Sequence, residues 1–278
     1  MRIGIIGLGH VGSTIAYTLL LKKIANELVL IDNNQAKVAA ETIELLDTAL
    51  NIKHKINILT HYQDLESADF IIFSAGDITI FENAESDRLA ELKVTAKIVE
   101  DVAPKLKESG FSGKIISITN PCDVIALYLA ELTGLPKEQV IGTGTVIDTD
   151  RLINITKRRD VMMIGEHGNS QVAVNQVSNS EESAGRAAGW QIYQAKRHTA
   201  FGIASTTFRI IQAMTEKNNE VLNVSCYDST KDCYYGWPSL FDGEKFVRQE
   251  LELTAEENIK FIKSIETIKQ NYQSIQSL

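Results

Sequence analysis

The 278-residue chain is 44% hydrophobic and carries a formal net charge of −8. A chain of this length buries one large core or two domains of moderate size. The acidic balance argues against a nucleic-acid partner, and because no apolar run is long enough to cross a bilayer, we expect no membrane partner. The three cysteines, Cys122, Cys226 and Cys233, lack a CxxC spacing, so we expect free thiols, no metal site and a cytoplasmic protein.

A buried strand at residues 1–6 runs into a glycine-rich turn and then a helix. The turn has the sequence Gly7-Leu8-Gly9-His10-Val11-Gly12. Gly7 permits the tight turn, Gly9 lets the backbone approach a diphosphate, and Gly12 lets the helix pack closely on the sheet. The unpaired N–H groups at the start of the helix favour an anion. This order of elements predicts a dinucleotide-binding βαβ unit.

The second strand of this unit, at residues 27–31, is followed by an acid. Asp32 comes twenty residues after Gly12, the offset at which a carboxylate accepts hydrogen bonds from the ribose of a dinucleotide. Because a carboxylate there repels a 2′-phosphate, the sequence favours NAD over NADP. The alternative is an ordinary glycine turn, but strand, helix, second strand and acid are all in register.

Strands and helices continue to alternate through the first half of the chain. We expect helices at residues 34–50 and 86–109, and strands at 55–59, 68–74, 114–118 and 139–142. The alternation predicts an α/β fold with a Rossmann-type, doubly wound parallel sheet. We assign residues 1–145 to this NAD-binding domain.

Residues 146–278 have a different pattern, which predicts an α+β substrate or catalytic domain. We expect antiparallel strands at 170–177 and 244–253, and long helices interrupted at glycines over 182–217. Thr254 and Glu257 form a capping box for the last helix. One apolar stripe follows on that helix: Ile259, Ile262, Ile265, Ile268, Tyr272 and Ile275. The stripe is core or subunit interface, and we expect a homo-oligomer, either dimer or tetramer.

Residues that follow two of the predicted strands are candidates for contact with the nicotinamide end of the cofactor. Ala75 and Gly76 follow one strand, and Thr119 and Asn120 follow the next. Ligands of open parallel sheets bind at this edge. Alternatively, Asn120 only caps the helix that Pro121 begins.

Four charged or titratable side chains are further candidates for chemistry. His167 is a loop histidine close to two glycines, and Asp148 and Arg151 lie three apart on one face of a helical turn. Arg88 opens a long helix after an acidic loop. The ordinary alternatives are a surface histidine, a surface ion pair and a solvated helix start. Weaker cases are His10, His54, His61 and His198.

Taken together, these motifs resemble the L-lactate and malate dehydrogenase superfamily, and more narrowly its L-2-hydroxyisocaproate dehydrogenase branch. The resemblance runs nearly end to end. It rests on the glycine turn, Ser74-Ala75-Gly76, residues 87–93, Thr119-Asn120-Pro121, and residues 140–145, 148–151 and 165–171. In this one order the motifs are highly specific, so the resemblance overrides the ordinary alternatives for single residues.

The resemblance implies an NAD-dependent oxidoreductase that interconverts L-2-hydroxy acids and 2-oxo acids. It implies that His167 is the acid–base group, that Asp148 orients it, and that Arg88 polarises the reacting carbonyl when the loop 77–85 closes. By the same resemblance Arg151 clamps the substrate carboxylate, which a lysine does not reproduce. Asn120 then hydrogen-bonds near the reacting oxygen and the nicotinamide, and Thr199 lines the pocket.

Two features depart from the family. Members that fructose 1,6-bisphosphate activates carry a second arginine two positions after the carboxylate-binding one, where this chain has Ile153, so we expect no such activation. The connections at 156–160 and 177–182 are shorter than the resemblance implies, so we predict at least one Cα–Cα step well beyond the roughly 3.8 Å of a trans peptide within them. The alternative is an unbroken chain with genuine deletions that strain this part of the molecule. A nucleotide-binding protein that lost catalysis through these deletions is the alternative of a different class, although Arg151 and His167 are retained.

The loop 77–85 is the guide to the substrate. Malate-type enzymes place an arginine in this loop for a second carboxylate, whereas the sequence here contains no cation, which disfavours a dicarboxylate. Ile78, Ile80 and Phe81 favour a roomier apolar pocket. We therefore predict 2-oxo acids with branched or longer aliphatic tails, such as 2-oxoisocaproate, with L-lactate dehydrogenase as the alternative.

Overall fold

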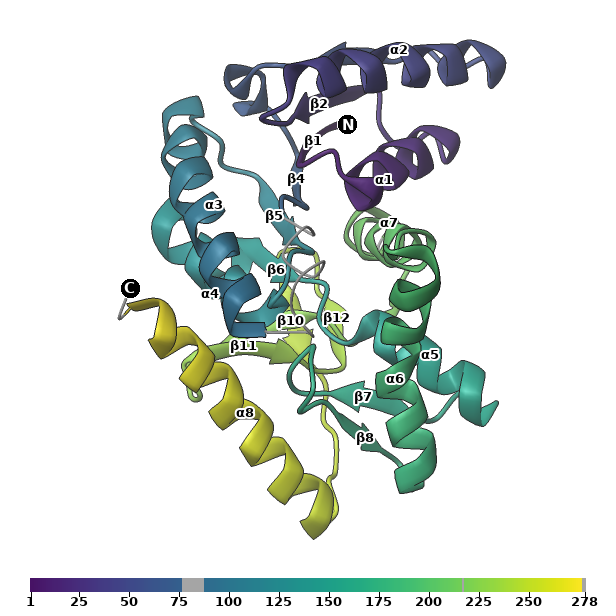
Figure 1. Cartoon of the computed structure of the whole chain (residues 1–278), viewed down its shortest axis with the longest axis vertical. Helices are drawn as coiled ribbons and strands as arrows, with labels where there is room; N and C mark the ends of the chain where they lie inside the picture. Colours follow the sequence, from purple (N-terminus) through teal and green to yellow (C-terminus); the bar gives the residue numbers. More distant parts are fainter. Residues whose placement is uncertain (77–87, 217, 277–278) are drawn as a thin grey trace.

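An eight-stranded sheet forms the centre of the molecule (Figure 1), in the order β11-β10-β6-β5-β4-β1-β2-β3. The structure is a computed structural model that describes residues 1–76, 88–216 and 218–276, with only the backbone of residues 88–90. The predicted closing loop 77–85, with Ile78, Ile80 and Phe81, lies outside the described residues. None of the described helices is both long and apolar enough to cross a bilayer.

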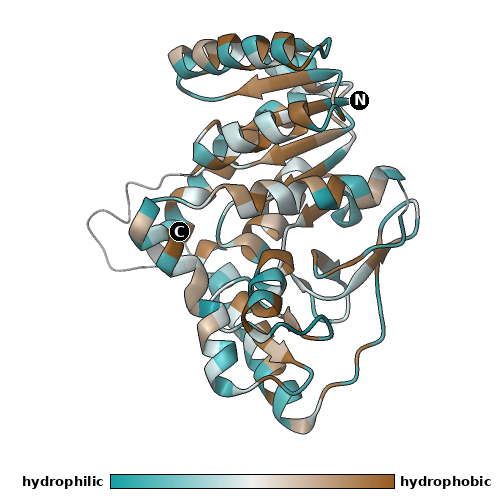
Figure 2. Ribbon diagram, turned by 90° about the vertical axis from the view of Figure 1, so that its right-hand side faces the viewer, coloured by the Kyte–Doolittle hydropathy of each residue, from teal (hydrophilic) through white to brown (hydrophobic). Residues whose placement is uncertain are grey.

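Six parallel strands confirm the predicted Rossmann-type sheet. They are β1 (Arg2–Ile6), β2 (Glu27–Ile31), β3 (Asn57–Leu59), β4 (Phe70–Phe73), β5 (Lys114–Ser117) and β6 (Val140–Gly142). Successive side chains of a strand point to opposite faces, so each strand serves two cores. On β2, for example, Leu28 and Leu30 belong to one core, and Val29 and Ile31 to the other. Figure 2 shows these apolar strands between the helices.

Helices from both halves of the chain cover the sheet. One core contains buried side chains of α1 (His10–Leu21), α2 (Gln35–Asn51) and α7 (Phe201–Glu216). The other contains side chains of α3 (Arg88–Ser109), α4 (Cys122–Thr133) and α8 (Ala255–Gln276), with the short turn η1 (Tyr62–Leu65). Two antiparallel strands from the second half, β10 (Ser225–Asp228) and β11 (Cys233–Gly236), extend the sheet beyond β6. The division at residue 145 stays a prediction, and the two parts share one sheet and both cores.

The second half also builds a smaller layer that carries much of the candidate site. It consists of α5 (Val146–Thr156), the β7–β8 hairpin (Met162–Ile164 and Val172–Val174) and α6 (Asn179–Lys196). A three-stranded sheet joins β9 (Val221–Leu222), β12 (Ser239–Phe241) and β13 (Phe246–Arg248), and the turn η3 (Lys137–Gln139) precedes β6. The strands between 221 and 241 were not predicted, because segments of two to four residues are too short to establish a period.

The expectation that glycines interrupt the helices over 182–217 is wrong. Gly185 and Gly189 lie inside α6, and Gly202 lies inside α7. Gly185 serves close packing, because a Cβ there would lie 2.8 Å from Met163 Cε. Instead, α6 ends at Arg197, which has a left-handed φ of 63°. The glycines are therefore packing residues, and a non-glycine residue makes the turn.

The predicted capping box of the last helix is confirmed, and its apolar stripe has two environments. The Glu257 N–H donates to Thr254 Oγ1 at 3.3 Å, and the Thr254 N–H donates to the Glu257 carboxylate at 2.8 Å. Ile265, Ile268 and Ile275 are buried in the core, whereas Ile259 and Ile262 are 69% and 51% exposed. The N-terminal part of the stripe therefore remains a surface.

Left-handed residues lie within the first short connection and just before the second. Lys157, Asn175 and Gln176 all have left-handed φ values, of 58°, 72° and 56°, which cost L residues free energy. Arg158 ties the two connections together, since its guanidinium donates to Asp160 and to the carbonyls of Asn175 and Gln176. The hydroxyl of Ser178 then accepts from the Glu181 N–H and begins α6.

Candidate active site

The glycine turn has the shape that a dinucleotide requires. Gly7 has a φ of 92°, and a Cβ on Gly12 would lie 1.9 Å from the Gly7 carbonyl oxygen, so neither position tolerates a side chain. A Cβ on Gly9 would meet no atom within 4 Å. Gly9 is the N-cap of α1 and provides no side-chain cap for it. The open space over these N–H groups fits a diphosphate.

Asp32 is tied to the same turn. Its Oδ2 accepts the Leu8 N–H at 2.7 Å, and its Oδ1 accepts the Asn34 N–H at 2.9 Å. The carboxylate at the end of β2 is thereby held beside the glycine turn, where ribose hydroxyls would reach it. Within the turn Leu8 is buried, Val11 is half-buried and His10 is exposed.

The predicted residues at the ends of β4 and β5 lie together. Thr119 Oγ1 donates to the Ala75 carbonyl oxygen at 2.9 Å, and a Cβ on Gly76 would lie 3.5 Å from Thr119 Cγ2. The α4 N-cap is Pro121, without a side-chain hydrogen bond, so Asn120 does not cap that helix. Among the described residues, the buried Oδ1 of Asn120 has no hydrogen-bond partner. An orphaned acceptor beside a cavity is suited to a ligand's donor.

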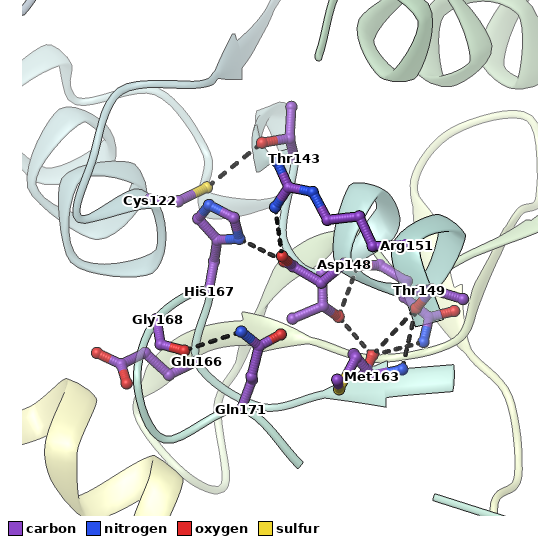
Figure 3. A network of polar contacts seen from close by, with 12 residues as sticks. Cys122, Thr143, Asp148, Thr149, Arg151, Met163, Glu166, His167, Gly168 and Gln171 are labelled. Carbon is purple, nitrogen blue, oxygen red and sulfur yellow. Dashed lines mark hydrogen bonds and ion pairs between the residues drawn. The ribbon is translucent and has the colours of Figure 1, made fainter. Parts of the chain in front are cut away.

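His167 and Arg151 converge on the carboxylate of Asp148 (Figure 3). His167 Nδ1 lies 2.6 Å from Asp148 Oδ2, and Arg151 Nη1 donates to Asp148 Oδ1 at 3.0 Å. Asp148 and Arg151 are on one face of α5, as their spacing predicted, whereas His167 comes from the loop between β7 and β8. The Asp148 side chain is only 3% exposed. Burial opposes its ionisation, but the charges of His167 and Arg151 outweigh burial and hold its pKa below the usual value.

A second buried carboxylate, which the sequence analysis missed, supports the histidine loop. Asp123 on α4 accepts the His167 N–H at 2.7 Å and the Ser225 hydroxyl at 2.5 Å. Burial raises the pKa of Asp123 to about 6, although both donors stabilise its anion. An acid in the first turn of a helix reads as an ordinary partner of the helix dipole, so its sequence carried no signal of this contact.

A cavity of about 340 Å³ opens beside these groups. Five of the predicted site residues line it: Asn120, Asp148, Arg151, His167 and Thr199. The lining also contains residues that the sequence analysis did not select: Glu91, Gly168, Asn169, Gln171, Arg186, Gly189, Trp190 and Tyr193. The spacing of the last four along α6 was the available signal, because it places them on one helix face. Arg88 begins α3, and its side chain lies outside the described part of the chain.

Close packing fixes the position of Arg151. A Cβ on Gly189 would lie 2.9 Å from Arg151 Nη1 and 3.2 Å from its Cζ, so the glycine leaves space for the guanidinium. Arg186, one turn earlier on α6, instead forms an ion pair of 3.1 Å with Glu182. The cavity thus contains a carboxylate-oriented arginine next to a histidine, and α6 forms one of its walls.

Comparisons with known proteins agree with this geometry. Residues 1–142 match the model of the lactate/malate dehydrogenase NAD-binding domain. An L-lactate dehydrogenase 2 of Staphylococcus aureus (strain Newman) is 31% identical over all of this chain and 97% of its own length. The ligand-bound minor L-lactate dehydrogenase from Enterococcus mundtii is 27% identical with a TM-score of 0.89, over 99% of this chain and 98% of its own. The malate dehydrogenase from Archaeoglobus fulgidus in complex with NADH is 26% identical with a TM-score of 0.90, over 99% and 100%.

Proposed function

Because the chain belongs to the lactate/malate dehydrogenase family and is an NAD-dependent hydroxyacid dehydrogenase, we propose that it interconverts L-2-hydroxy acids and 2-oxo acids with branched or longer aliphatic tails. The observation that carries the proposed residue roles is the buried Asp148 carboxylate, which contacts both His167 and Arg151. One anion thereby orients a proton-transfer group and a carboxylate-binding group toward the same cavity.

His167 is the proposed acid–base residue. The Asp148 carboxylate accepts a hydrogen bond from Nδ1 of the His167 ring. The other ring nitrogen, Nε2, is therefore the one that exchanges a proton with the substrate. Bound NADH supplies the hydride for C2 of the 2-oxo acid. As negative charge develops on the C2 oxygen, His167 gives it a proton, and Asp148 stabilises the imidazolium before that transfer. In oxidation the proton moves back from the hydroxyl to His167.

Arg151 is the proposed ligand of the substrate carboxylate. A guanidinium binds a carboxylate through two parallel hydrogen bonds, and the contact with Asp148 restricts the orientation of this one. Asn120 and Thr199 are proposed substrate-binding residues because both line the cavity. Arg88 is the proposed group that polarises the C2 carbonyl, and Ala75, Gly76 and Thr119 are proposed neighbours of the nicotinamide.

The wall formed by α6 supports an apolar substrate tail. Trp190 and Tyr193 line the cavity and stack with ring centroids 5.3 Å apart. Each methylene that a substrate buries against such a wall adds up to about 0.8 kcal/mol of binding. L-lactate dehydrogenase is the second candidate, because two of the similar proteins carry that name.

The comparison of kcat/KM for 2-oxoisocaproate, 2-oxobutyrate, pyruvate and oxaloacetate tests this proposal. We expect 2-oxoisocaproate to be preferred and oxaloacetate to be the poorest substrate. A tenfold preference for pyruvate would favour the lactate assignment. NADH binding without turnover of any 2-oxo acid would support a catalytically impaired NAD-binding protein.

Homo-oligomerisation and a cytoplasmic location are also proposed. Three apolar side chains of α2 are exposed, namely Ile43, Leu46 and Leu50, and they offer a surface for a second copy of the chain. Light scattering coupled to size-exclusion chromatography measures the oligomeric state directly. The three cysteines are free, which suits a reducing compartment.

A further inference from the structure

We propose that His198, at the junction between α6 and α7, is a cofactor-binding residue that forms with His10 a two-imidazole site for the diphosphate of NAD. The proposal depends on NAD binding alone and is independent of the substrate and of the roles proposed for His167 and Arg151. It assigns a cofactor contact to the second half of the chain.

The two imidazoles stack on each other although 188 positions separate them in the sequence. Their ring centroids are 4.0 Å apart, and their planes differ by 13°. His10 is the first residue of α1, beside the open space over Gly9, and α1 packs against α7 (Figure 1). Within the described residues, neither imidazole donates or accepts a hydrogen bond. Both rings therefore retain ring nitrogens that are available to an anion at the start of α1.

Charged groups of both signs lie around the pair, and the two that act on the imidazole of His10 are the basic residues His198 and Lys37. His198 from the junction and Lys37 from α2 both lower the pKa of His10. Glu41 of α2 accepts a hydrogen bond from the Ser13 hydroxyl, one turn further along α1. The Asp32 carboxylate accepts from the Leu8 N–H within the glycine turn. Lys196 and Arg197 immediately precede His198, so the junction itself is basic.

Because of these neighbouring charges, binding of the cofactor is coupled to the uptake of protons. Partial burial, His198 and Lys37 together lower the pKa of His10, since two adjacent imidazolium ions repel each other. A diphosphate carries the opposite charge and stabilises the protonated form of His10. Binding of the cofactor is therefore accompanied by proton uptake near neutral pH.

The contact also reaches the substrate cavity. His198 directly precedes Thr199, which lines the cavity next to Arg151 and His167. A diphosphate held by both imidazoles fixes the junction against the glycine turn. Cofactor binding then positions this part of the cavity wall before substrate enters.

The test measures binding rather than turnover. NADH binding is followed by fluorescence between pH 6 and pH 9, and calorimetry in buffers of different ionisation enthalpy counts the protons taken up. The variants are H10S and H198A, with His54→Asn as the matched control, because His54 contacts the Ala25 carbonyl oxygen away from the glycine turn. ADP and adenosine serve as probes with and without a diphosphate.

We expect the affinity of the wild-type protein for NADH and ADP to rise as the pH falls, and its affinity for adenosine to stay constant. At pH 6, H198A and H10S should each bind NADH about tenfold more weakly than the wild type, because each variant loses one charge-assisted hydrogen bond. At pH 9 their NADH affinity should equal that of the wild type. Their proton uptake should fall, and H54N should match the wild type. Unchanged proton uptake in both variants, or an equal loss at every pH, would overturn the proposal. Because His198 lies on a connection between helices, H198A remains informative if H10S fails to fold.

Discussion

Asp148 contacts two of the residues that are proposed to act on the substrate. Its two carboxylate oxygens serve different partners, His167 and Arg151, and its side chain is almost fully buried. Hydrogen bonds and electrostatic attraction from His167 and Arg151 compensate the loss of solvation, which is why the pKa of this carboxyl is lowered despite burial. Removing the charge therefore affects proton transfer and substrate binding together.

The substitution Asp148→Asn tests this shared role. We expect kcat for 2-oxo acid reduction to fall by about 10²-fold or more, because the amide cannot stabilise the imidazolium, and we expect KM to rise. The matched control is Asp150→Asn, two positions along α5, whose native carboxylate pairs with Arg209 at 2.8 Å. Steady-state kinetics of both variants, with NADH affinity measured separately, provide the readout. Similar kinetics for the two variants would remove Asp148 from the mechanism.

At the scale of elements, the position of α6 decides how Arg151 presents its guanidinium. Gly189→Ala is expected to raise KM for 2-oxo acids several-fold, because the new Cβ would occupy space within 3 Å of Arg151 Nη1. Alanine is also the better helix former, so the free energy of unfolding should not fall. Gly185→Ala is the control on the same helix, since its Cβ meets Met163 and Leu152. An unchanged KM in G189A, alongside intact NADH binding, would show that this contact does not position Arg151.

At the scale of the whole molecule, Asp123 joins α4, β10 and the histidine loop. Its pKa is about 6 in the folded protein, against 3.8 for the ordinary carboxyl. Below about pH 3 the group is protonated in both states and has no effect. As the pH rises from 4 to 6 the unfolded state ionises first, so this group lowers stability by an amount approaching about 3 kcal/mol.

The variant Asp123→Asn lacks this titration. The difference in free energy of unfolding between this variant and the wild type should therefore shift in favour of the variant as the pH rises from 4 to 7. This shift is expected whether the amide stabilises or destabilises the protein at pH 4. Urea unfolding at four pH values across this range measures the difference. Parallel stability curves for the two proteins would contradict a raised pKa at this position.

Regulation is a further property of the whole molecule. Ile153 stands where a sugar-phosphate-activated relative carries arginine, and it packs beside the small apolar cluster of Leu152, Val161, Met163 and Ala173. An apolar side chain cannot bind a phosphate, so fructose 1,6-bisphosphate should leave kcat and KM unchanged. The prediction is tested by titrating the sugar phosphate at a subsaturating concentration of 2-oxo acid. Activation of several-fold would contradict it.

Local patterns account for what the sequence by itself determined. The glycine turn and Asp32 lie within one βαβ unit, and Asp148 and Arg151 lie on one helical turn, so spacing alone specifies their geometry. The alternation of strands and helices likewise predicted the parallel sheet. The meeting of His167 with Asp148 was implied by the family resemblance, because no local period links a loop histidine to a helix nineteen residues earlier.

Only the tertiary structure decided which distant residues meet. The chain crosses from α4 to β10 to bring Ser225 to Asp123, and it returns through α6 to place Gly189 against Arg151. The stack of His198 on His10 arises in the same way, from the packing of α7 on α1. Such contacts follow from how two hydrophobic faces fit on one sheet. They have no signature in the sequence because the residues that make them are ordinary within their own helices and loops.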